Sequence, residues 1–312
     1  MNKKEIYRLG VATKMNAGAT KQEAILGVAE ATGKTYATIA RSLRKTTKKG
    51  DCMDNRLGKR ILYIPDTQIK VGSTTEHIRA VARRAVEKRY DIIVLAGDWH
   101  DMPSLSVFNS RRDAEGLRVA DDIKVGNDAL DEFMEIINKI PKKKRPEIHI
   151  TLGNHSCKVR IERFYKDNPQ MTGMIEDSGT AHFESHGIIV HDFLDILEIE
   201  GIRFSHYITN PHSLKGSPLG GTADTMLKNA GFSFVMGHQQ GLKMAMHYLS
   251  DGTRRFGAVC GSFYPHDEDY MSIQANKHFR GVLELNEVRD GGADPCVISL
   301  EYLMNAYGDS SE

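Results

Sequence analysis

Residues 92–101 read IIVLAGDWHD, an unbroken apolar run that ends in a glycine and polar side chains. The run has the length and composition of a buried strand, and its polar end follows where that strand would stop. Four further apolar runs along the chain lead into Asp, Asn, His or Gln in the same way. The five polar groups are Asp66-Thr67-Gln68, Gly97-Asp98-Trp99-His100-Asp101, Gly153-Asn154-His155, His206 and Gly237-His238-Gln239-Gln240.

Ligands of open α/β sheets bind beyond the carboxyl ends of the strands, so polar residues gathered there predict a metal site at the sheet rim. Each residue alone also has a structural explanation. Asp66 and Asp98 could cap turns, Asn154 could occupy a left-handed turn, His206 could be a core histidine, and His238 could bond locally. We favour one shared site, because five accidents would have to fall in order at five strand ends.

The whole chain has the composition of a soluble globular protein, with 312 residues, 40% hydrophobic and 27% charged. No segment has the length of a membrane span, and the first residues do not read as a signal peptide, so we expect no membrane partner. The four cysteines lie far apart, which favours a reduced, cytoplasmic protein without a cysteine metal site. They are Cys52, Cys157, Cys260 and Cys296.

The net charge of +1 conceals a basic head on an acidic body. Residues 1–50 hold 11 Lys/Arg and 3 Asp/Glu, whereas the rest of the chain holds 31 and 38. The head reads as three short helices, at 3–15, from Thr20 with Glu23 completing a capping box, and at 35–46. A basic third helix is similar to that of a helix-turn-helix module, and its outward residues are candidate nucleic-acid contacts. These residues are Arg41, Arg44 and Lys45. A solvated basic arm or an oligomerisation element remains the alternative.

Residues 51–59 read as a linker, and the body from 60 to 312 begins with alternating strands and helices. Strands are expected at 60–65, 91–96, 147–152, 188–199, 201–206 and 232–236. Helices are expected at 74–90, within 113–139 and at 222–230. The tail reads as strands at 243–249, 256–261, 281–287 and 296–302. A βαβ start with a β-rich finish predicts an α/β protein with two stacked mixed sheets flanked by helices.

The ordered motifs resemble those of the calcineurin-like metallophosphoesterase superfamily: DxH, GDxxD, GNH(E/D), a single His and GHxH. The resemblance covers about residues 60–265 and implies a four-layer αββα sandwich with two metal ions. It implies that Asp98 bridges both metals, that Asn154, His206 and His238 complete one site, and that Asp66 serves the other. The stretches IPDTQ and DMPSLS, residues 64–68 and 101–106, are also similar to a phage-encoded branch of DNA-repair exonucleases, implying a host cytoplasm.

Three positions depart from that pattern: Gln68 and Gln240 stand where the family has histidines, and Ser156 follows Gly-Asn-His where the family has an acidic residue. Amide oxygens suit harder ions than imidazole does, so the change favours Mn²⁺ or Mg²⁺ over Zn²⁺ at this weakened site. The site could bind its ion weakly, fill only with substrate phosphate, or be empty in an impaired enzyme. We favour the first two, because the other metal site and His155 are intact.

The expected reaction is phosphate-ester hydrolysis by a metal-activated water. The resemblance implies that His155 faces the phosphate and that Asp101 orients it, whereas we expect His100 at the surface. Arg111 and Arg112 follow the second motif and could hold flanking phosphates, or lie on a solvated helix instead.

The basic head favours DNA as substrate, cleaved as an exonuclease or endonuclease. A small phosphoester or cyclic-nucleotide phosphoesterase is one alternative. A nucleic-acid-binding protein that has lost catalysis is another. The sequence does not indicate an oligomeric state.

Overall fold

The computed structural model describes residues 13–14, 18–35, 57–107, 115–268 and 272–309. The chain divides into two compact units, Met1–Asn55 and Arg56–Glu312. In the first unit, helix α2 (Lys21–Thr32) begins at the predicted capping box of Thr20 and Glu23 and ends at Gly33, whose φ is 66°. The expected helix at 35–46 and most of that at 3–15 lie outside the described residues, as do Arg41, Arg44 and Lys45.

The second unit contains a six-stranded mixed sheet with the strand order β11-β10-β1-β2-β3-β4. Strands β1 to β4 run parallel, while β10 and β11 are antiparallel to their neighbours. The bounds are β1 Lys59–Ile64, β2 Ile92–Leu95, β3 Glu147–Thr151, β4 Ile189–His191, β10 Gly281–Arg289 and β11 Gly292–Ser299. Helices connect the parallel strands, as βαβ crossovers require.

A five-stranded mixed sheet follows, with the order β5-β6-β7-β9-β8. Its central strands β6, β7 and β9 are parallel, and the outer strands β5 and β8 are antiparallel to them. The bounds are β5 Leu197–Ile199, β6 Ile202–Ser205, β7 Ser233–Met236, β8 Leu242–Tyr248 and β9 Arg254–Cys260. The prediction of an α/β protein with two mixed sheets is therefore confirmed.

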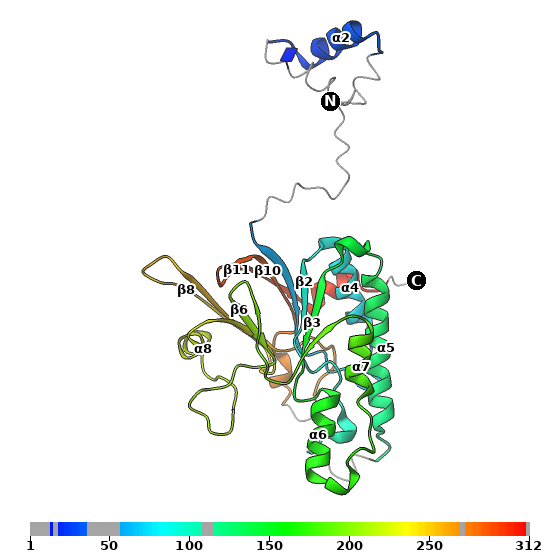
Figure 1. The fold of residues 1–312 in the computed structure, drawn as a ribbon, viewed down its shortest axis with the longest axis vertical. Coiled ribbons are helices and arrows are strands. Elements are labelled where there is room, and N and C mark those ends of the chain that lie inside the picture. The colour runs from blue at the N-terminus through cyan, green and yellow to red at the C-terminus, as the bar shows by residue number, and fades with distance from the viewer. Residues whose placement is uncertain (1–12, 15–17, 36–56, 108–114, 269–271, 310–312) are drawn as a thin grey trace. The chain divides into compact units, whose positions relative to one another are not determined.

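The described residues form seven α-helices, six of them in the second unit. Helices α4, α5 and α7 lie on one side of the six-stranded sheet, and α8 lies beside the five-stranded sheet (Figure 1). The bounds are α4 Glu76–Lys88, α5 Val119–Ile137, α6 Cys157–Asp167, α7 Ser178–Ser185, α8 Ala223–Ala230 and α9 Leu300–Tyr307. Short 3₁₀ turns occur at Pro103–Leu105, Lys142–Lys144, Pro169–Met171 and Ala275–Lys277.

Alternation along the strands divides the core into layers. Leu62 of β1 faces helices α4 and α5 and belongs to the same buried cluster as Phe133 of α5. Tyr63, the next residue, faces the other way and joins Phe204 and Val235 of the second sheet. Successive strand side chains point to opposite faces, so one strand serves both cores. A third cluster holds α8 against the second sheet through residues such as Leu227.

Two expected strands of the body need correction. The strand expected at 188–199 is two short strands in different sheets, β4 and β5, because a turn closed by the Asp195 N–H and the Asp192 carbonyl oxygen separates them. The tail strand predicted at 296–302 ends at Ser299, whose side chain accepts the N–H of Tyr302 and caps α9. Helix α6, directly after the third motif, was not predicted. A membrane-spanning helix is absent from the part of the chain that the structure describes, because every helix there is too short or too polar.

Candidate metal centre

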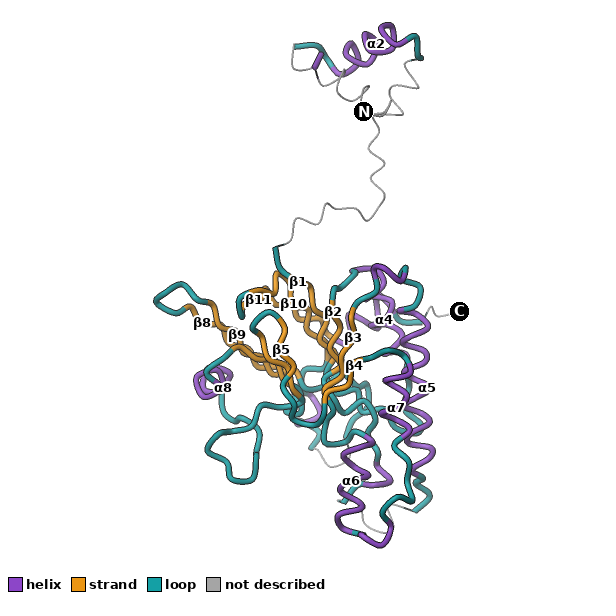
Figure 2. Tube along the Cα trace, viewed as in Figure 1, coloured by secondary structure: helices purple, strands orange, loops and turns teal. Residues whose placement is uncertain are grey.

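The polar motifs meet because they follow parallel strands. Asp66 follows β1, Asp98 follows β2 and Asn154 follows β3. His206 directly follows β6, and His238 follows β7 in the other sheet. Neighbouring parallel strands end at the same sheet edge, where ligands bind. In Figure 2 these strands lead into loops that gather at one end of both sheets.

Asp98, His206 and His238 form a buried group of potential metal ligands. One ligand atom from each residue lies within 4.8 Å of those of the other two. Asp98 Oδ2 is 3.4 Å from His206 Nε2, and the rings of His206 and His238 have centroids 5.0 Å apart. A carboxylate with two imidazoles is a common donor set for divalent transition metals. These three residues can therefore hold a metal ion.

His206 is fully buried, and both of its ring nitrogens face oxygen atoms. Nδ1 lies 3.0 Å from the carbonyl oxygen of Ala96, and Nε2 lies 2.8 Å from Oδ1 of Asn154. A neutral imidazole carries one N–H and can donate to only one of the two. When Nδ1–H donates to the backbone, Nε2 and Asn154 Oδ1 present two lone pairs to one point. A cation at that point satisfies both.

Glycines let these loops approach the carboxylates closely. A Cβ at Gly153 would come within 2.1 Å of Asp98 Oδ1, and a Cβ at Gly237 within 2.5 Å of Asp66 Oδ1. Any larger residue would push the strand-end loops apart. The backbone N–H that follows Gly237, at His238, instead donates to Asp66 Oδ2 at 3.1 Å. The glycines of the third and fifth motifs thus have a steric role at the site.

Three candidate ligands have left-handed backbone conformations that non-glycine residues rarely adopt. The φ angles are 43° at Gln68, 37° at Asp98 and 61° at His238. Such positions cost of order 1–3 kcal/mol each and cluster at functional sites. The neighbouring loops hold them in place, because the N–H of Gln68 donates to the Asp98 carbonyl oxygen at 2.8 Å. The loops that carry these three candidate ligands are therefore held in a strained backbone conformation.

Two buried carboxylates face each other across the group. Burial and the nearby charge of Asp98 raise the pKa of Asp66 well above its ordinary value. Burial opposes ionisation of Asp98 as well, but His206 and His155 lower its pKa overall. Burial lowers the pKa of His238 to about 4, so this imidazole is neutral and able to act as a ligand. A divalent cation offsets the repulsion between two carboxylates.

The two glutamines that replace histidines lie on the Asp66 side. Gln68 is buried, and its Oε1 has no hydrogen-bond donor among the residues that the structure describes. Leaving a buried carbonyl oxygen without a hydrogen bond costs about 1–3 kcal/mol. A cation bound to this oxygen would offset that cost. Gln240, two residues after His238, is half-buried. These donors fit a hard divalent ion.

His155 and Asp101 form a hydrogen-bonded pair beside the buried group. Nδ1 of His155 lies 2.7 Å from Oδ1 of Asp101, so Nε2 is the ring atom left for a substrate. Burial opposes the imidazolium form, yet Asp98 and Asp101 raise the pKa of His155 above its ordinary value. Ser156 and Cys157, which follow, have structural contacts: Ser156 Oγ accepts the N–H of Gly153, and Cys157 packs on Met102.

Arg160 is a candidate that the sequence reading missed. It lies on α6 one turn after Ser156 and is only 2% exposed. Its Nε and Nη1 have no acceptor among the described side chains and backbone. Burial lowers the pKa of its guanidinium, and the negative charges of Asp98 and Asp101 oppose that shift. The sequence signal that could have identified Arg160 was a single arginine on the buried face of a helix that begins just after Gly-Asn-His.

Two other candidates, Arg111 and Arg112, lie outside the described residues. His100, expected at the surface, is 2% exposed, and Nε2 lies 3.2 Å from Asn127 Oδ1. It is buried because Gly126 of α5 leaves room for the ring, whose Cδ2 would lie 2.0 Å from a Cβ there. His100 is therefore a packing residue.

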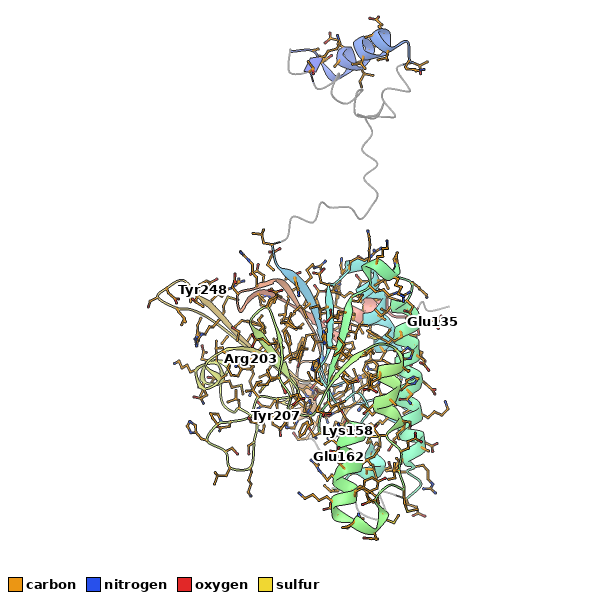
Figure 3. The ribbon with its side chains drawn as sticks, viewed as in Figure 1. Glu135, Lys158, Glu162, Arg203, Tyr207 and Tyr248 are labelled. Atoms are coloured by element: carbon orange, nitrogen blue, oxygen red, sulfur yellow. The ribbon has the colours of Figure 1, made fainter. Side chains whose placement is uncertain are left out.

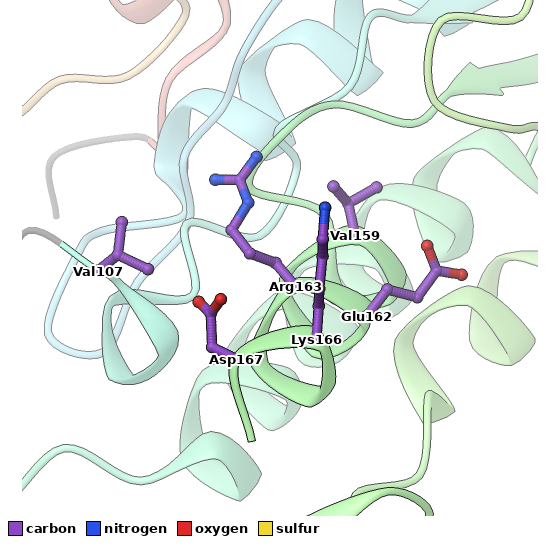
Figure 4. A pocket seen from close by; sticks show the side chains of 6 residues that line it. All are labelled: Val107, Val159, Glu162, Arg163, Lys166 and Asp167. Atoms are coloured by element: carbon purple, nitrogen blue, oxygen red, sulfur yellow. The ribbon is translucent and has the colours of Figure 1, made fainter. Parts of the chain in front are cut away.

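One hollow of the described residues has no lining residue in common with the centre. It has a volume of about 610 Å³ and includes Val107, Val159, Arg163 and Lys166 (Figure 4). Glu162 and Asp167 also line it, so its charges balance and do not favour an anion. Tyr207, labelled in Figure 3, packs against the centre, because its ring centroid is 4.8 Å from that of His238.

No protein-family model matches the chain, and no curated protein matches it either. The structure and the chemistry of its residues therefore carry the functional conclusion. They show a buried Asp/His/His group that could bind metal at the meeting point of two mixed sheets.

Proposed function

We propose that this protein is a divalent-metal-dependent phosphodiesterase that hydrolyses DNA. The observation that carries the proposal is the convergence of Asp98, His206 and His238 within 4.8 Å. The hydrogen-bonded pair of His155 and Asp101 and the buried cation of Arg160 lie beside that group. A metal group, a proton donor and a phosphate-binding cation are the parts that phosphoester hydrolysis needs.

The fold supports a calcineurin-like metallophosphoesterase assignment. Two mixed sheets share one core, and helices cover the outer side of each, as a four-layer αββα sandwich requires. The motif order and its placement at strand ends also agree with that family. The phage exonuclease branch is a finer proposal that rests on two short stretches, at 64–68 and 101–106.

The residues would hold two cations with different donor sets. Asn154, His206 and His238 would complete one site, and Asp66, Gln68 and Gln240 the other, with Asp98 shared. When bound, two divalent cations lower the pKa of a water molecule and offset charge on the phosphate oxygens. The amide oxygens favour Mn²⁺ or Mg²⁺ in the glutamine-containing site and make it the weaker of the two.

His155 would hold the proton that the leaving oxygen needs. Asp101 accepts the Nδ1–H, which fixes the ring and leaves a proton at Nε2 for the substrate. The raised pKa of His155 favours that protonated form. We therefore assign His155 as general acid and Asp101 as its positioning residue.

Arg160 would bind a non-bridging oxygen of the substrate phosphate. Two of its guanidinium nitrogens have no described acceptor, and a phosphate offers oxygens in matching geometry. Desolvation of an unpaired cation is costly, so a site of this kind is stabilised when an anion arrives. The same role is expected from the sequence for Arg111 and Arg112, which lie outside the described residues.

DNA is the proposed substrate because residues 1–50 carry 11 basic and 3 acidic side chains. Such a head attracts polyanions without reading their sequence. Deleting residues 1–55 is expected to weaken DNA binding while turnover of a small ester survives. Loss of both activities in a folded truncation would contradict this division of roles. The cytoplasm is the proposed compartment, because the three described cysteines are free thiols.

The direct test of catalysis uses bis(p-nitrophenyl) phosphate with Mn²⁺. The wild type is compared with His238→Gln, which removes a ligand, and with His247→Gln, whose histidine pairs with Asp224 on the surface. We expect a loss of about 100-fold or more in kcat/KM only for His238→Gln. Thermal melts establish that both variants fold. Equal activity in all three proteins would refute the proposed centre.

A further inference from the structure

A second group of potential metal ligands lies outside the candidate centre and shares no residue with it. Asp131 on α5, His182 on α7 and His186 at the end of α7 have ligand atoms within 4.8 Å of one another. One carboxylate oxygen, Asp131 Oδ1, lies 2.9 Å from His182 Nε2 and 2.7 Å from His186 Nε2. Two imidazoles and a carboxylate therefore converge on one point.

Helix geometry explains the convergence. His182 and His186 are four residues apart, so they lie on the same face of α7. Their rings are nearly perpendicular, at 88°, with centroids 4.9 Å apart, and this leaves both Nε2 atoms directed at the carboxylate. Asp131 comes from the neighbouring helix α5. Histidines at this spacing with one further ligand form tetrahedral sites that retain a position for water.

The group is charged and reachable. Slight burial disfavours ionisation of Asp131, but hydrogen bonds from His186 and His182 lower its pKa overall. The side chain of Asp131 is 53% exposed and those of the histidines about a quarter, so an ion can enter from solvent. Another pair, His247 and Asp224 on the surface, has one imidazole per carboxylate and offers a matched control.

We propose that Asp131, His182 and His186 form a Zn²⁺ site that joins α5 to α7. Imidazole nitrogens favour Zn²⁺ over Mn²⁺, in contrast to the oxygen-rich half of the candidate centre. A divalent ion would replace two hydrogen bonds to a shared carboxylate oxygen with three coordination bonds. The proposal does not depend on the phosphodiesterase assignment.

Zn²⁺ at this position would stabilise the loop after β2. Phe183, next to His182, packs edge-on against Trp99 and His100 of the second motif, with centroids 6.2 and 5.9 Å apart. Gly179 brings α7 so close to α6 that an added Cβ would lie 2.5 Å from Cys157 Sγ. Because α7 contacts both elements, fixing it to α5 raises the cost of unfolding them.

The test measures Zn²⁺ binding to the full-length protein by calorimetry and by thermal melts. The variants are His186→Ala and the control His247→Ala. We expect the wild type and the control to bind one more Zn²⁺ per chain than His186→Ala. Zn²⁺ at about a hundred times its Kd should raise their Tm by roughly 5 °C more than it raises that of His186→Ala. The same stoichiometry and the same Tm shift in all three would overturn the proposal.

Asp131→Asn provides a second variant that keeps the shape of an exposed side chain and removes its charge. We expect its affinity for Zn²⁺ at this site to fall at least about tenfold, with the far-ultraviolet circular dichroism unchanged. Mn²⁺ should give a much smaller Tm shift than Zn²⁺ through the same site. Unchanged Zn²⁺ affinity in Asp131→Asn would show that the carboxylate is not a ligand and would also overturn the proposal.

Discussion

The backbone N–H of His155 donates to Oδ1 of Asp98 at 2.7 Å, although 57 positions separate the two residues. This bond joins the loop after β2 to the loop after β3. It occupies one carboxylate oxygen and leaves Oδ2 facing His206 Nε2 at 3.4 Å. The same residue thus positions the proposed general acid and offers an oxygen to a cation. The proposed catalytic chemistry and the connection between the strand-end loops therefore depend on one side chain.

The pair of His155 and Asp101 predicts a shift in pH dependence. Because Asp101 helps to raise the pKa of His155, Asp101→Asn should lower that pKa. A general acid must be protonated, so the alkaline limb of the kcat/KM profile should move to lower pH. The expected loss is about 10–100-fold and larger for DNA than for a p-nitrophenyl ester, whose leaving group needs less protonation.

The pH profiles of wild type and Asp101→Asn on both substrates provide the check. An identical alkaline limb in the two proteins would show that Asp101 does not act through His155. The His155→Ala background gives a second check. If Asp101→Asn shifts the profile of His155→Ala as much as it shifts that of the wild type, the same conclusion follows.

Arg160 predicts a substrate-binding defect of a defined kind. Arg160→Met keeps most of the side-chain volume and removes the charge, so kcat/KM should fall about 10–100-fold, mainly through KM. Lys158→Met is the matched control, because this cation lies on the same helix and pairs with Asp192. Inhibition by inorganic phosphate should weaken only in Arg160→Met. Equal phosphate inhibition constants for both variants would exclude the assigned role.

The glutamines of the weaker site predict metal preference. Replacing both Gln68 and Gln240 by histidine restores imidazole donors, which favour Zn²⁺ or Fe²⁺ over Mn²⁺. The ratio of Mn²⁺-supported to Zn²⁺-supported activity should fall by about tenfold or more in Gln68→His/Gln240→His. Activity assays on metal-stripped protein with added ions measure that ratio. The metal-preference account is wrong if the double variant and the wild type give the same ratio.

His77 predicts loss of stability in acid. Burial, with the nearby charges of His266 and Arg79, lowers its pKa from 6.5 to about 3. Below pH 6.5 the unfolded chain binds a proton that the folded chain excludes. The folded state therefore becomes less stable as the pH is lowered. The loss from this group between about pH 7 and about pH 5 is roughly 2 kcal/mol.

Urea unfolding of His77→Leu at both pH values measures this contribution. The variant should lose about 2 kcal/mol less than the wild type on acidification, whereas the control His212→Gln, on an exposed loop, should behave as the wild type. A wild-type pH dependence in a folded His77→Leu protein would assign the acid sensitivity to other groups.

Much of the sheet architecture was predictable because the signals are local. Apolar runs such as 92–95 became strands, and the polar residues after them lie at a common edge because parallel neighbours end together. The end of β11 was not predictable in this way. Residues 300–302 suit a strand by composition, but Ser299 caps a helix there, and tertiary packing of Leu303 favours that helix.

The site was only partly predictable for a related reason. The motifs predicted the candidate metal ligands, yet single residues such as Arg160 of the centre, or Asp131 of the second group, belong to no motif. Their importance depends on burial and on partners from other elements, which sequence spacing does not encode. His100 shows the opposite error: a histidine among polar residues looked exposed, but Gly126 of a later helix makes room for it.

The most direct measurement is Mn²⁺-dependent hydrolysis of labelled single- and double-stranded DNA, and of bis(p-nitrophenyl) phosphate, by wild type and Asp98→Asn. We predict that the wild type cleaves DNA and the small ester with Mn²⁺. Asp98→Asn, folded by circular dichroism, should lose both activities by at least about 100-fold. Turnover of the small ester alone would contradict the assignment of DNA as substrate. The absence of turnover with any divalent metal, or equal turnover in Asp98→Asn, would contradict the metal-centred phosphodiesterase itself.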